Sequence, residues 1–256
     1  MNVLEGFGFV LVLSGFVIGC RFEPSEDSVS NSPPAFDDTQ ESTWTLQPGW
    51  GLELNAPCSI DFWANDEEMG HFYLVRTSEG KFITAPGFPE TWRRARRTGK
   101  PRAGIHAFVL GEPAIEQAIW FLSHTSSDDW GELPPVLDLE SLWVENGMST
   151  KACEREWLRW LRRVEAVMDC RPILKMGSEF ANRHIQDTLF NRYPLWLSDW
   201  SSELQNVPKI WEETGWTFAS APPLEKGQIS PDGGQPVLCR ATPNFPFVQP
   251  SSPAHE

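Results

Sequence analysis

The chain has 256 residues, of which 40% are hydrophobic and 22% charged, and its formal net charge at pH 7 is −14. This length and composition are typical of one sizeable globular domain, or of one domain with a tail. The negative charge argues against a nucleic-acid partner, because binding to phosphates needs a basic face. The five histidines are scattered and no Cys-x-x-Cys motif occurs, so we expect neither a metal site nor a cofactor.

The N-terminal segment resembles a bacterial lipoprotein signal. Residues 7–19 are mostly apolar, about as long as the hydrophobic part of a signal peptide and too short to span a bilayer comfortably. The apolar segment ends in Gly19 and Cys20. This pair is similar to the cleavage junction of a lipoprotein, where the Cys after a small residue is lipidated and becomes the new N-terminus. We therefore predict a signal peptide over residues 1–20 and a lipid anchor on Cys20. The start carries Glu5 and no Lys or Arg, so an ordinary cleaved signal or an uncleaved anchor remains the alternative.

The segment that follows is acidic. Residues 21–50 hold six Asp and Glu against one Arg and are rich in Ser and Pro. A low apolar content with one sign of charge is typical of a disordered tether. We predict such a tether over residues 21–56, in an exported, membrane-anchored protein that faces the periplasm or the cell surface.

From residue 57 the sequence alternates between strand-like and helix-like stretches. The predicted strands are 59–63, 72–76, 104–109, 135–139, 172–176, 195–198, 216–220 and 236–239, and the predicted helices are 89–97, 113–124, 150–169 and 178–190. This alternation is typical of a parallel α/β sheet, and eight strands indicate a closed barrel. The last strands leave little room for helices. We therefore predict an irregular TIM-like barrel over residues 57–247, with helices missing in its C-terminal part and a flexible tail at 248–256.

The helix at 150–169 is the clearest of the four. Its apolar residues, Trp157 and Leu161 among them, fall on one helical stripe, whereas its arginines lie off that stripe. Ser149 or Thr150 is expected to cap its N-terminus.

The predicted strand at 135–139 ends in two carboxylates, Asp138 and Glu140. Side chains alternate along a strand, so these two acids point to the same side. Two nearby acids can be held one protonated and one ionised, which glycosidic bond cleavage requires. In parallel barrels the active site lies where the C-terminal ends of the strands meet, and Asp61 falls at such an end too. The alternative is that these acids are solvated residues at a strand end.

Six segments resemble, in order, the motifs of glycoside hydrolase family 25, the Chalaropsis-type lysozymes. They include the family's Gly-Ile-Asp opening, its Asp-x-Glu motif and its Pro-Leu-Trp strand. The segments are 58–63, 73–80, 103–108, 137–140, 193–198 and 216–218. The resemblance extends from about residue 58 to residue 245.

This resemblance implies a monomeric enzyme that acts on peptidoglycan glycan strands. The family cleaves the β-1,4 bond between N-acetylmuramic acid and N-acetylglucosamine. By resemblance, Glu140 is the general acid and then the base, and Asp138 is an ionised group that orients the 2-acetamido group of the substrate. Asp61 binds sugar or tunes the charge of the pair. This is a substrate-assisted, retaining scheme. The anions at Asp138 and Asp61 are expected to raise the pKa of Glu140 and keep it protonated.

Other residues are candidates for substrate binding. The chain has thirteen Trp, whose flat rings suit sugar stacking. The candidates are Trp63, His106, Trp196, Asp199 and Trp200. For the tryptophans, packing in the core is the alternative.

Three departures from the family pattern leave other functions open. His106-Ala107 stands where the family has Tyr-His, and the fifth strand ends Lys175-Met176-Gly177-Ser178 where the family often has Tyr-Thr-Ser, so an aromatic hydroxyl is absent. The acid of the closing Asp-x-Asn-x-Phe motif is missing, and Asp199 and Asp232 are the candidates to replace it. The alternatives are therefore a glycan-binding relative without turnover and a hydrolase of another N-acetylated glycan, such as chitin.

The cysteines outside the signal peptide number four: Cys58, Cys153, Cys170 and Cys239. An even number in an exported chain permits two disulfides, and the three possible pairings stay open.

Overall fold

The computed structural model describes residues 49–55, 70–124, 129–140, 142–143, 147–199, 207–215, 217–220 and 234–239, the last range by its backbone alone. The predicted signal peptide with Cys20, the first part of the predicted tether and the predicted tail at 248–256 lie outside the described residues.

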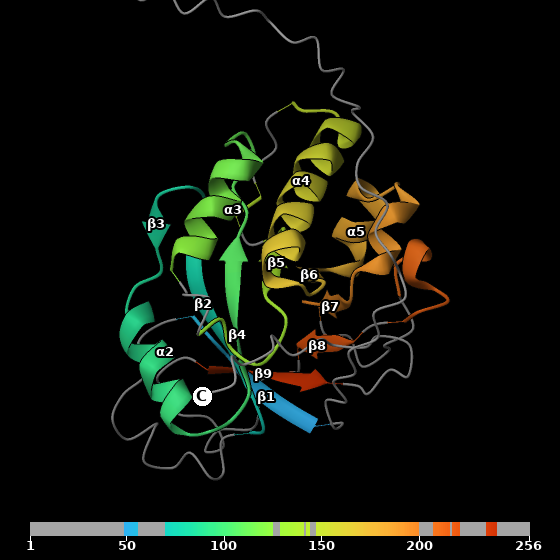
Figure 1. Ribbon diagram of the computed structural model, residues 1–256. Helices are drawn as coiled ribbons and strands as arrows, with labels where there is room; N and C mark the ends of the chain where they lie inside the picture. Colours follow the sequence, from blue (N-terminus) through green and yellow to red (C-terminus); the bar gives the residue numbers. More distant parts are fainter. Residues whose placement is uncertain are drawn as a thin grey trace, which may run out of the picture. The chain divides into compact units, whose positions relative to one another are not determined.

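Eight strands form a closed ring (Figure 1). They are β1 (Gly49–Leu54), β2 (Tyr73–Glu79), β4 (Arg102–Ala107), β5 (Val136–Asp138), β6 (Ile173–Met176), β7 (Leu195–Leu197), β8 (Phe218–Ser220) and β9 (Gly234–Cys239). Neighbours from β1 through β2, β4, β5, β6 and β7 to β8 are parallel. β9 closes the ring by pairing antiparallel with both β8 and β1. The two-residue strand β3 (Ile83–Thr84) extends the edge of β2 outside this ring.

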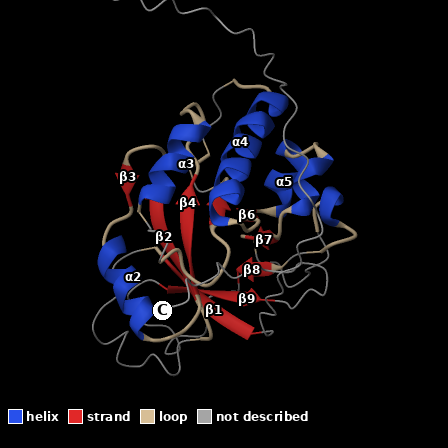
Figure 2. Cartoon of the chain, viewed as in Figure 1, coloured by secondary structure: helices blue, strands red, loops and turns tan. Residues whose placement is uncertain are grey.

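The helices are unevenly distributed around the ring (Figure 2). α2 (Phe88–Arg97), α3 (Ala114–Ser123), α4 (Thr150–Met168) and α5 (Ser178–His184) all precede β7, as does the 3-10 helix η2 (Thr188–Arg192). After β7 the described residues contain only the short 3-10 helix η3 (Lys209–Trp211). The prediction of an irregular α/β barrel whose C-terminal part lacks helices is therefore confirmed.

β1 corrects the predicted boundary between tether and barrel. Its six residues, Gly-Trp-Gly-Leu-Glu-Leu, lie inside the predicted tether 21–56, yet they pair with β2 and β9. The predicted first strand at 59–63 lies outside the described residues. The composition of the surrounding acidic segment hid this strand, because it contributes only a few apolar residues to a window dominated by Ser, Pro and acids. The barrel therefore includes residues from Gly49 onward.

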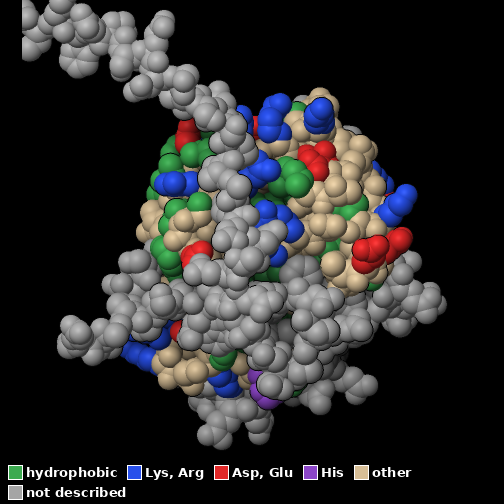
Figure 3. Space-filling view, turned by 45° about the vertical axis from the view of Figure 1, so that its right-hand side comes forward, with side chains coloured by type: hydrophobic (Ala, Val, Ile, Leu, Met, Phe, Trp, Pro, Cys, Tyr) green, Lys and Arg blue, Asp and Glu red, His purple; other side chains and the backbone are tan. Residues whose placement is uncertain are grey.

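α4 joins the helical layer to the ring through its apolar stripe. The Ser149 side chain caps the helix by accepting the backbone N–H of Ala152, as predicted. Trp157, Trp160 and Leu161 are fully buried against α3 and the outer faces of the strands. Burying each such side chain contributes about 1.5–3 kcal/mol. The opposite side of α4 is exposed and basic, with side chains at Lys151, Arg155, Arg159, Arg162 and Arg163, and Figure 3 shows Lys and Arg side chains on this helical side of the molecule.

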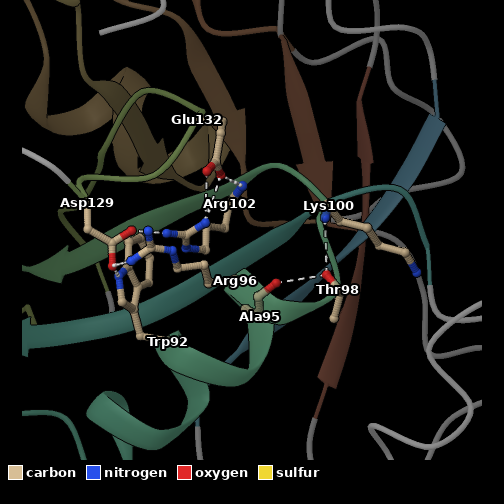
Figure 4. A network of polar contacts seen from close by, with 8 residues as sticks. All are labelled: Trp92, Ala95, Arg96, Thr98, Lys100, Arg102, Asp129 and Glu132. Carbon is tan, nitrogen blue, oxygen red and sulfur yellow. Dashed lines mark hydrogen bonds and ion pairs between the residues drawn. The ribbon is translucent and has the colours of Figure 1, made fainter. Parts of the chain in front are cut away.

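A polar cluster at the N-terminal ends of the strands ties α2 to β4 and to the segment before β5 (Figure 4). Arg102, at the start of β4, is buried, and its Nη1 donates to Glu132 Oε1 at 2.8 Å while its Nη2 contacts Asp129. The Arg102 guanidinium also lies over the Trp92 ring of α2, 4.6 Å from its centroid. This cluster lies at the end of the ring opposite to Asp138, so its role is structural.

Two of the four predicted disulfide cysteines are unpaired. Cys153 and Cys170 are free and buried, and burial raises the pKa of the Cys170 thiol to about 12. The pairings that involve either residue are therefore not formed. Cys58 and the side chain of Cys239 lie outside the described part of the chain.

The described residues contain neither a membrane-spanning helix nor a cluster of metal ligands. No described helix is long and apolar enough to cross a membrane. No group of three or more His, Cys, Asp and Glu side chains in the described ranges has an arrangement that could hold a metal ion.

His106 is a core residue, which corrects its predicted role in substrate binding. It lies on β4 with no exposed surface, and its ring stacks on Trp160 of α4 with centroids 5.4 Å apart. Nδ1 lies 2.9 Å from Ser78 Oγ, and Nε2 lies 3.3 Å from Gln117 Oε1. The side chain therefore faces the helical layer and cannot reach a ligand inside the ring. Burial lowers the pKa of His106 to about 3, although the hydrogen bond to Gln117 acts in the opposite direction.

The buried neutral His106 predicts a loss of stability in acid. The unfolded chain binds a proton at this residue below pH 6.5, whereas the folded chain does not until about pH 3. The free energy of unfolding should therefore fall as the pH drops through this window, by roughly 1.4 kcal/mol for each pH unit from this residue alone. Urea denaturation over a pH series should show a smaller slope in His106→Gln than in wild type. Equal slopes in the two proteins would show that His106 is not held neutral.

Candidate active site

Asp138 and Glu140 lie together at the C-terminal end of β5, as predicted. The Asp138 carboxylate is almost fully buried, and its Oδ1 accepts the backbone N–H of Glu140 at 3.2 Å. Its other oxygen, Oδ2, contacts two cations, Arg76 Nη2 at 3.1 Å and Lys175 Nζ at 3.2 Å. Three donors on one carboxylate favour its ionised form.

The Glu140 side chain is held by the start of α5 and the end of β7. Oε2 accepts the backbone N–H of Gly177 at 2.7 Å and the hydroxyl of Ser198 at 3.0 Å. Both bonds go to the same oxygen, so Oε1 makes no hydrogen bond to a described residue. When Glu140 carries a proton, that proton belongs on Oε1, because Oε2 is occupied as an acceptor. The geometry thus gives this carboxyl group one anchored oxygen and one oxygen able to donate.

Asp199 lies beside Glu140 at the same end of the ring. Both of its carboxylate oxygens are 2.9 Å from the backbone N of Ser178, the first residue of α5. Gly177 separates it from Glu140: a Cβ at that position would lie 3.1 Å from Glu140 Oε2 and 3.3 Å from Asp199 Cγ. The structure therefore places the Asp199 carboxylate beside that of Glu140, with Gly177 between them. Asp232 lies outside the described residues.

Glu53 and Lys175 are charged residues of the site that the sequence patterns did not predict. Glu53 points into the ring from β1 with no exposed surface, and its Oε1 lies 2.5 Å from Lys175 Nζ. Burial acts to lower the pKa of Lys175, but the charges of Glu53 and Asp138 outweigh it, so this pKa is raised and the side chain stays cationic. A signal was present in the sequence, because Lys175 interrupts the apolar run of β6, and a charge inside a buried strand needs a partner.

Three predicted site residues, Asp61, Trp63 and Trp200, lie outside the described part of the chain. Asp61 was expected to supply an acid at the end of the first strand. Among the described strands the first is β1, and the acid that it directs into the ring is Glu53.

Trp196 belongs to the packing of the barrel interior, which corrects its predicted contact with sugar. Its ring has no exposed surface and packs in a cluster with inward-facing residues of the other strands, among them Phe218. Its Nε1 donates to Ser220 Oγ at 3.1 Å. Lys175 Nζ lies 4.6 Å from the ring centroid, so the indole supports that ammonium group from inside the ring.

Comparison with known proteins places this site in a family. Residues 57–225 match the family model for glycosyl hydrolases family 25. The chain belongs to this family. It is therefore a glycoside hydrolase by descent, and the matched range begins after β1. No curated protein sequence matches the chain.

Solved structures of lysozymes share the fold. A bacterial lysozyme from Streptomyces coelicolor superposes with a TM-score of 0.66 at 18% identity, covering 77% of this chain and 94% of the other. A muramidase from Acremonium alcalophilum has a TM-score of 0.63 at 20% identity, covering 75% and 93% of the two chains. A family 25 lysozyme from Aspergillus fumigatus has the same TM-score and identity, covering 76% and 94%.

The close approach of Gly177 to two carboxylates predicts that a larger residue at this position disturbs the site. An added methyl group at this position would press on Glu140 Oε2 and on the Asp199 carboxylate, at 3.1 and 3.3 Å. Gly177→Ala should therefore displace the Glu140 side chain and lower glycan hydrolysis about tenfold or more, because small misplacements of a reacting group are costly. Thermal unfolding should change little. Gly99→Ala, whose Cβ would meet nothing within 4 Å but whose φ of +73° strains an alanine, is the control for a destabilising glycine replacement outside the site, and it should keep wild-type activity. Full activity in Gly177→Ala would show that the position of Glu140 is not set by this contact.

Proposed function

We propose that the protein is a muramidase that cleaves the β-1,4 bond between N-acetylmuramic acid and N-acetylglucosamine in peptidoglycan. One observation carries the proposal: Glu140 and Asp138 lie side by side at the C-terminal end of a barrel strand, in a chain that belongs to family 25. The family's solved relatives named above are lysozymes and muramidases.

The proposed reaction assigns one step to each carboxyl group. Glu140, protonated on Oε1, donates its proton to the oxygen of the leaving sugar as the glycosidic bond breaks. The 2-acetamido carbonyl oxygen of the substrate attacks the anomeric carbon and forms a cyclic intermediate. Water then opens that intermediate, and Glu140 Oε1 takes the proton back from the water. Asp138, ionised by its three donors, orients the acetamido group and stabilises the positive charge that develops on it.

A second candidate function is glycan binding without turnover. The observation that favours it is the contact of Asp138 Oδ2 with both Arg76 and Lys175, since these cations offset the negative charge that the acetamido group would meet. The missing acid of the closing motif points in the same direction. A hydrolase of another N-acetylated glycan, such as chitin, stays as an outcome of the test below.

We also propose that the protein is exported and held on a membrane by lipid on Cys20. The apolar segment before Cys20 supports this proposal. The 28 residues between Cys20 and Gly49 form a chain that spans at most about 90–100 Å, so the barrel would act on peptidoglycan within that distance of the membrane. Peptidoglycan strands would be its partner and the barrel would act as a monomer.

The decisive test compares Glu140→Gln with wild type on purified peptidoglycan sacculi. Wild type should release muropeptides with reducing N-acetylmuramic acid ends. Glu140→Gln should lower the rate by about 10²–10⁴-fold, the usual contribution of a general acid. Glu179→Gln is the matched control, because Glu179 is an exposed acid on α5 that is paired with Arg183.

Each other outcome has a defined meaning. An unchanged rate in Glu140→Gln would contradict the assignment of the acid. Binding of wild type to sacculi without release would favour the glycan-binding function. Turnover of chitin oligomers but not of sacculi would favour the other glycan.

A further inference from the structure

Two buried carboxylates share one ammonium group inside the ring. Lys175 Nζ lies 2.5 Å from Glu53 Oε1 and 3.2 Å from Asp138 Oδ2. The three side chains come from β1, β5 and β6 and are 10% exposed or less. Two anions this close, and this far from water, repel each other strongly unless a cation lies between them.

Among the described residues, the charges around this pair balance. Arg76 from β2 is the second cation and contacts the same Asp138 oxygen at 3.1 Å. The Trp196 ring of β7 lies against the Lys175 ammonium group inside the ring of strands. His106 of β4 faces outward and is neutral, so it adds no charge. Glu140 and Asp199 are bound to the backbone at Gly177 and Ser178 instead. The interior set is thus Glu53 and Asp138 against Lys175 and Arg76.

Asp138 transmits this arrangement to Glu140. One oxygen of Asp138 is fixed by the cations, and the other accepts the backbone N–H of Glu140. A rotation of the Asp138 carboxylate would therefore shift the start of the segment that carries Glu140. The position of Lys175 affects both groups to which the proposed reaction assigns a step.

We propose that Lys175 is a positioning residue of this hydrolase: its ammonium group offsets the repulsion between the Asp138 and Glu53 carboxylates and holds Asp138 in the orientation that the substrate requires. The inference rests on the proposed muramidase function. In the described part of the ring, the charge of this lysine is matched by the acid that β1 directs inward, Glu53.

Removal of the cation should have an effect that depends on pH. The charges of Glu53 and Asp138 raise the pKa of Lys175, so the wild-type side chain is cationic throughout the neutral range. In Lys175→Met the two carboxylates lose their shared cation, and the pair should bind a proton at a higher pH than in wild type. Asp138 is then partly neutral where the reaction needs its charge, and activity returns only as the pH is raised.

The experiment uses three proteins: wild type, Lys175→Met, and the double variant Glu53→Gln with Lys175→Met. The double variant removes one anion with the cation, so it restores the charge balance and removes the main reason for Lys175→Met to misfold. Two readouts are collected for each: the pH profile of kcat/KM on soluble glycan fragments, and the titration of the Asp138 carboxyl carbon by 13C NMR in Asp-labelled protein.

Lys175→Met should lose about tenfold or more of kcat/KM on the acidic side and approach wild type on the alkaline side, one pKa unit being worth tenfold there. Its Asp138 titration should move to higher pH, and the double variant should move both readouts back toward wild type. An equal loss of activity at every pH, or an unmoved Asp138 titration, would overturn the proposal. If wild type hydrolyses no glycan, the proposed function fails, and the NMR titration alone still decides the role of Lys175.

Discussion

The cost of placing carboxylates inside a barrel is the constraint on which the site depends. An isolated buried charge is strongly unfavourable, so each acid that points into the ring must have a cation or several donors within reach. Glu53 and Asp138 meet this requirement through Lys175 and Arg76, at contacts of 2.5 to 3.2 Å. The four side chains come from β1, β2, β5 and β6, so the charge set links opposite sides of the ring. Removing one charged side chain leaves its partner buried without a counter-charge, which typically costs about 3–5 kcal/mol of stability.

The closed ring of strands brings these charged side chains and Glu140 together at one end of the barrel. Parallel strands bring their C-terminal ends to one rim, where Asp138 and Glu140 meet the start of α5 and the end of β7. Backbone N–H groups at Gly177 and Ser178 hold Glu140 and Asp199, while the cations hold Asp138. Two acids that are two positions apart in the sequence are thus bound by different chemistry. This difference allows one carboxyl group to stay ionised while the other has an oxygen free to carry a proton.

Patterns that depend on local periodicity were predicted well from the sequence. The apolar stripe and the Ser149 cap located α4, and the i, i+2 spacing brought Asp138 and Glu140 together at the end of β5. β1 was missed because its six residues lie within an acidic, Ser- and Pro-rich segment whose composition outweighs them. The partners of the charges could not be found either, because the pairing of Glu53 with Lys175 joins residues 122 positions apart.

The direction in which single residues face was harder to predict than the elements themselves. His106 and Trp196 both lie on correctly expected strands, yet one faces the helices and the other fills the ring. A resemblance of motif cannot distinguish these faces when the neighbouring residues differ from the family pattern. His106 faces the helices, where it bonds the buried Gln117. Trp196 faces the interior of the ring, where Lys175 lies over it.

Lys175 and Asp138 act as one energetic unit within the ring. A double-mutant cycle on the free energy of unfolding tests this coupling directly, with Lys175→Met, Asp138→Asn and the pair together. We expect a coupling energy of about 1 kcal/mol or more, with the double variant less destabilised than the sum of the single variants. Effects that add to within roughly 0.3 kcal/mol would contradict it.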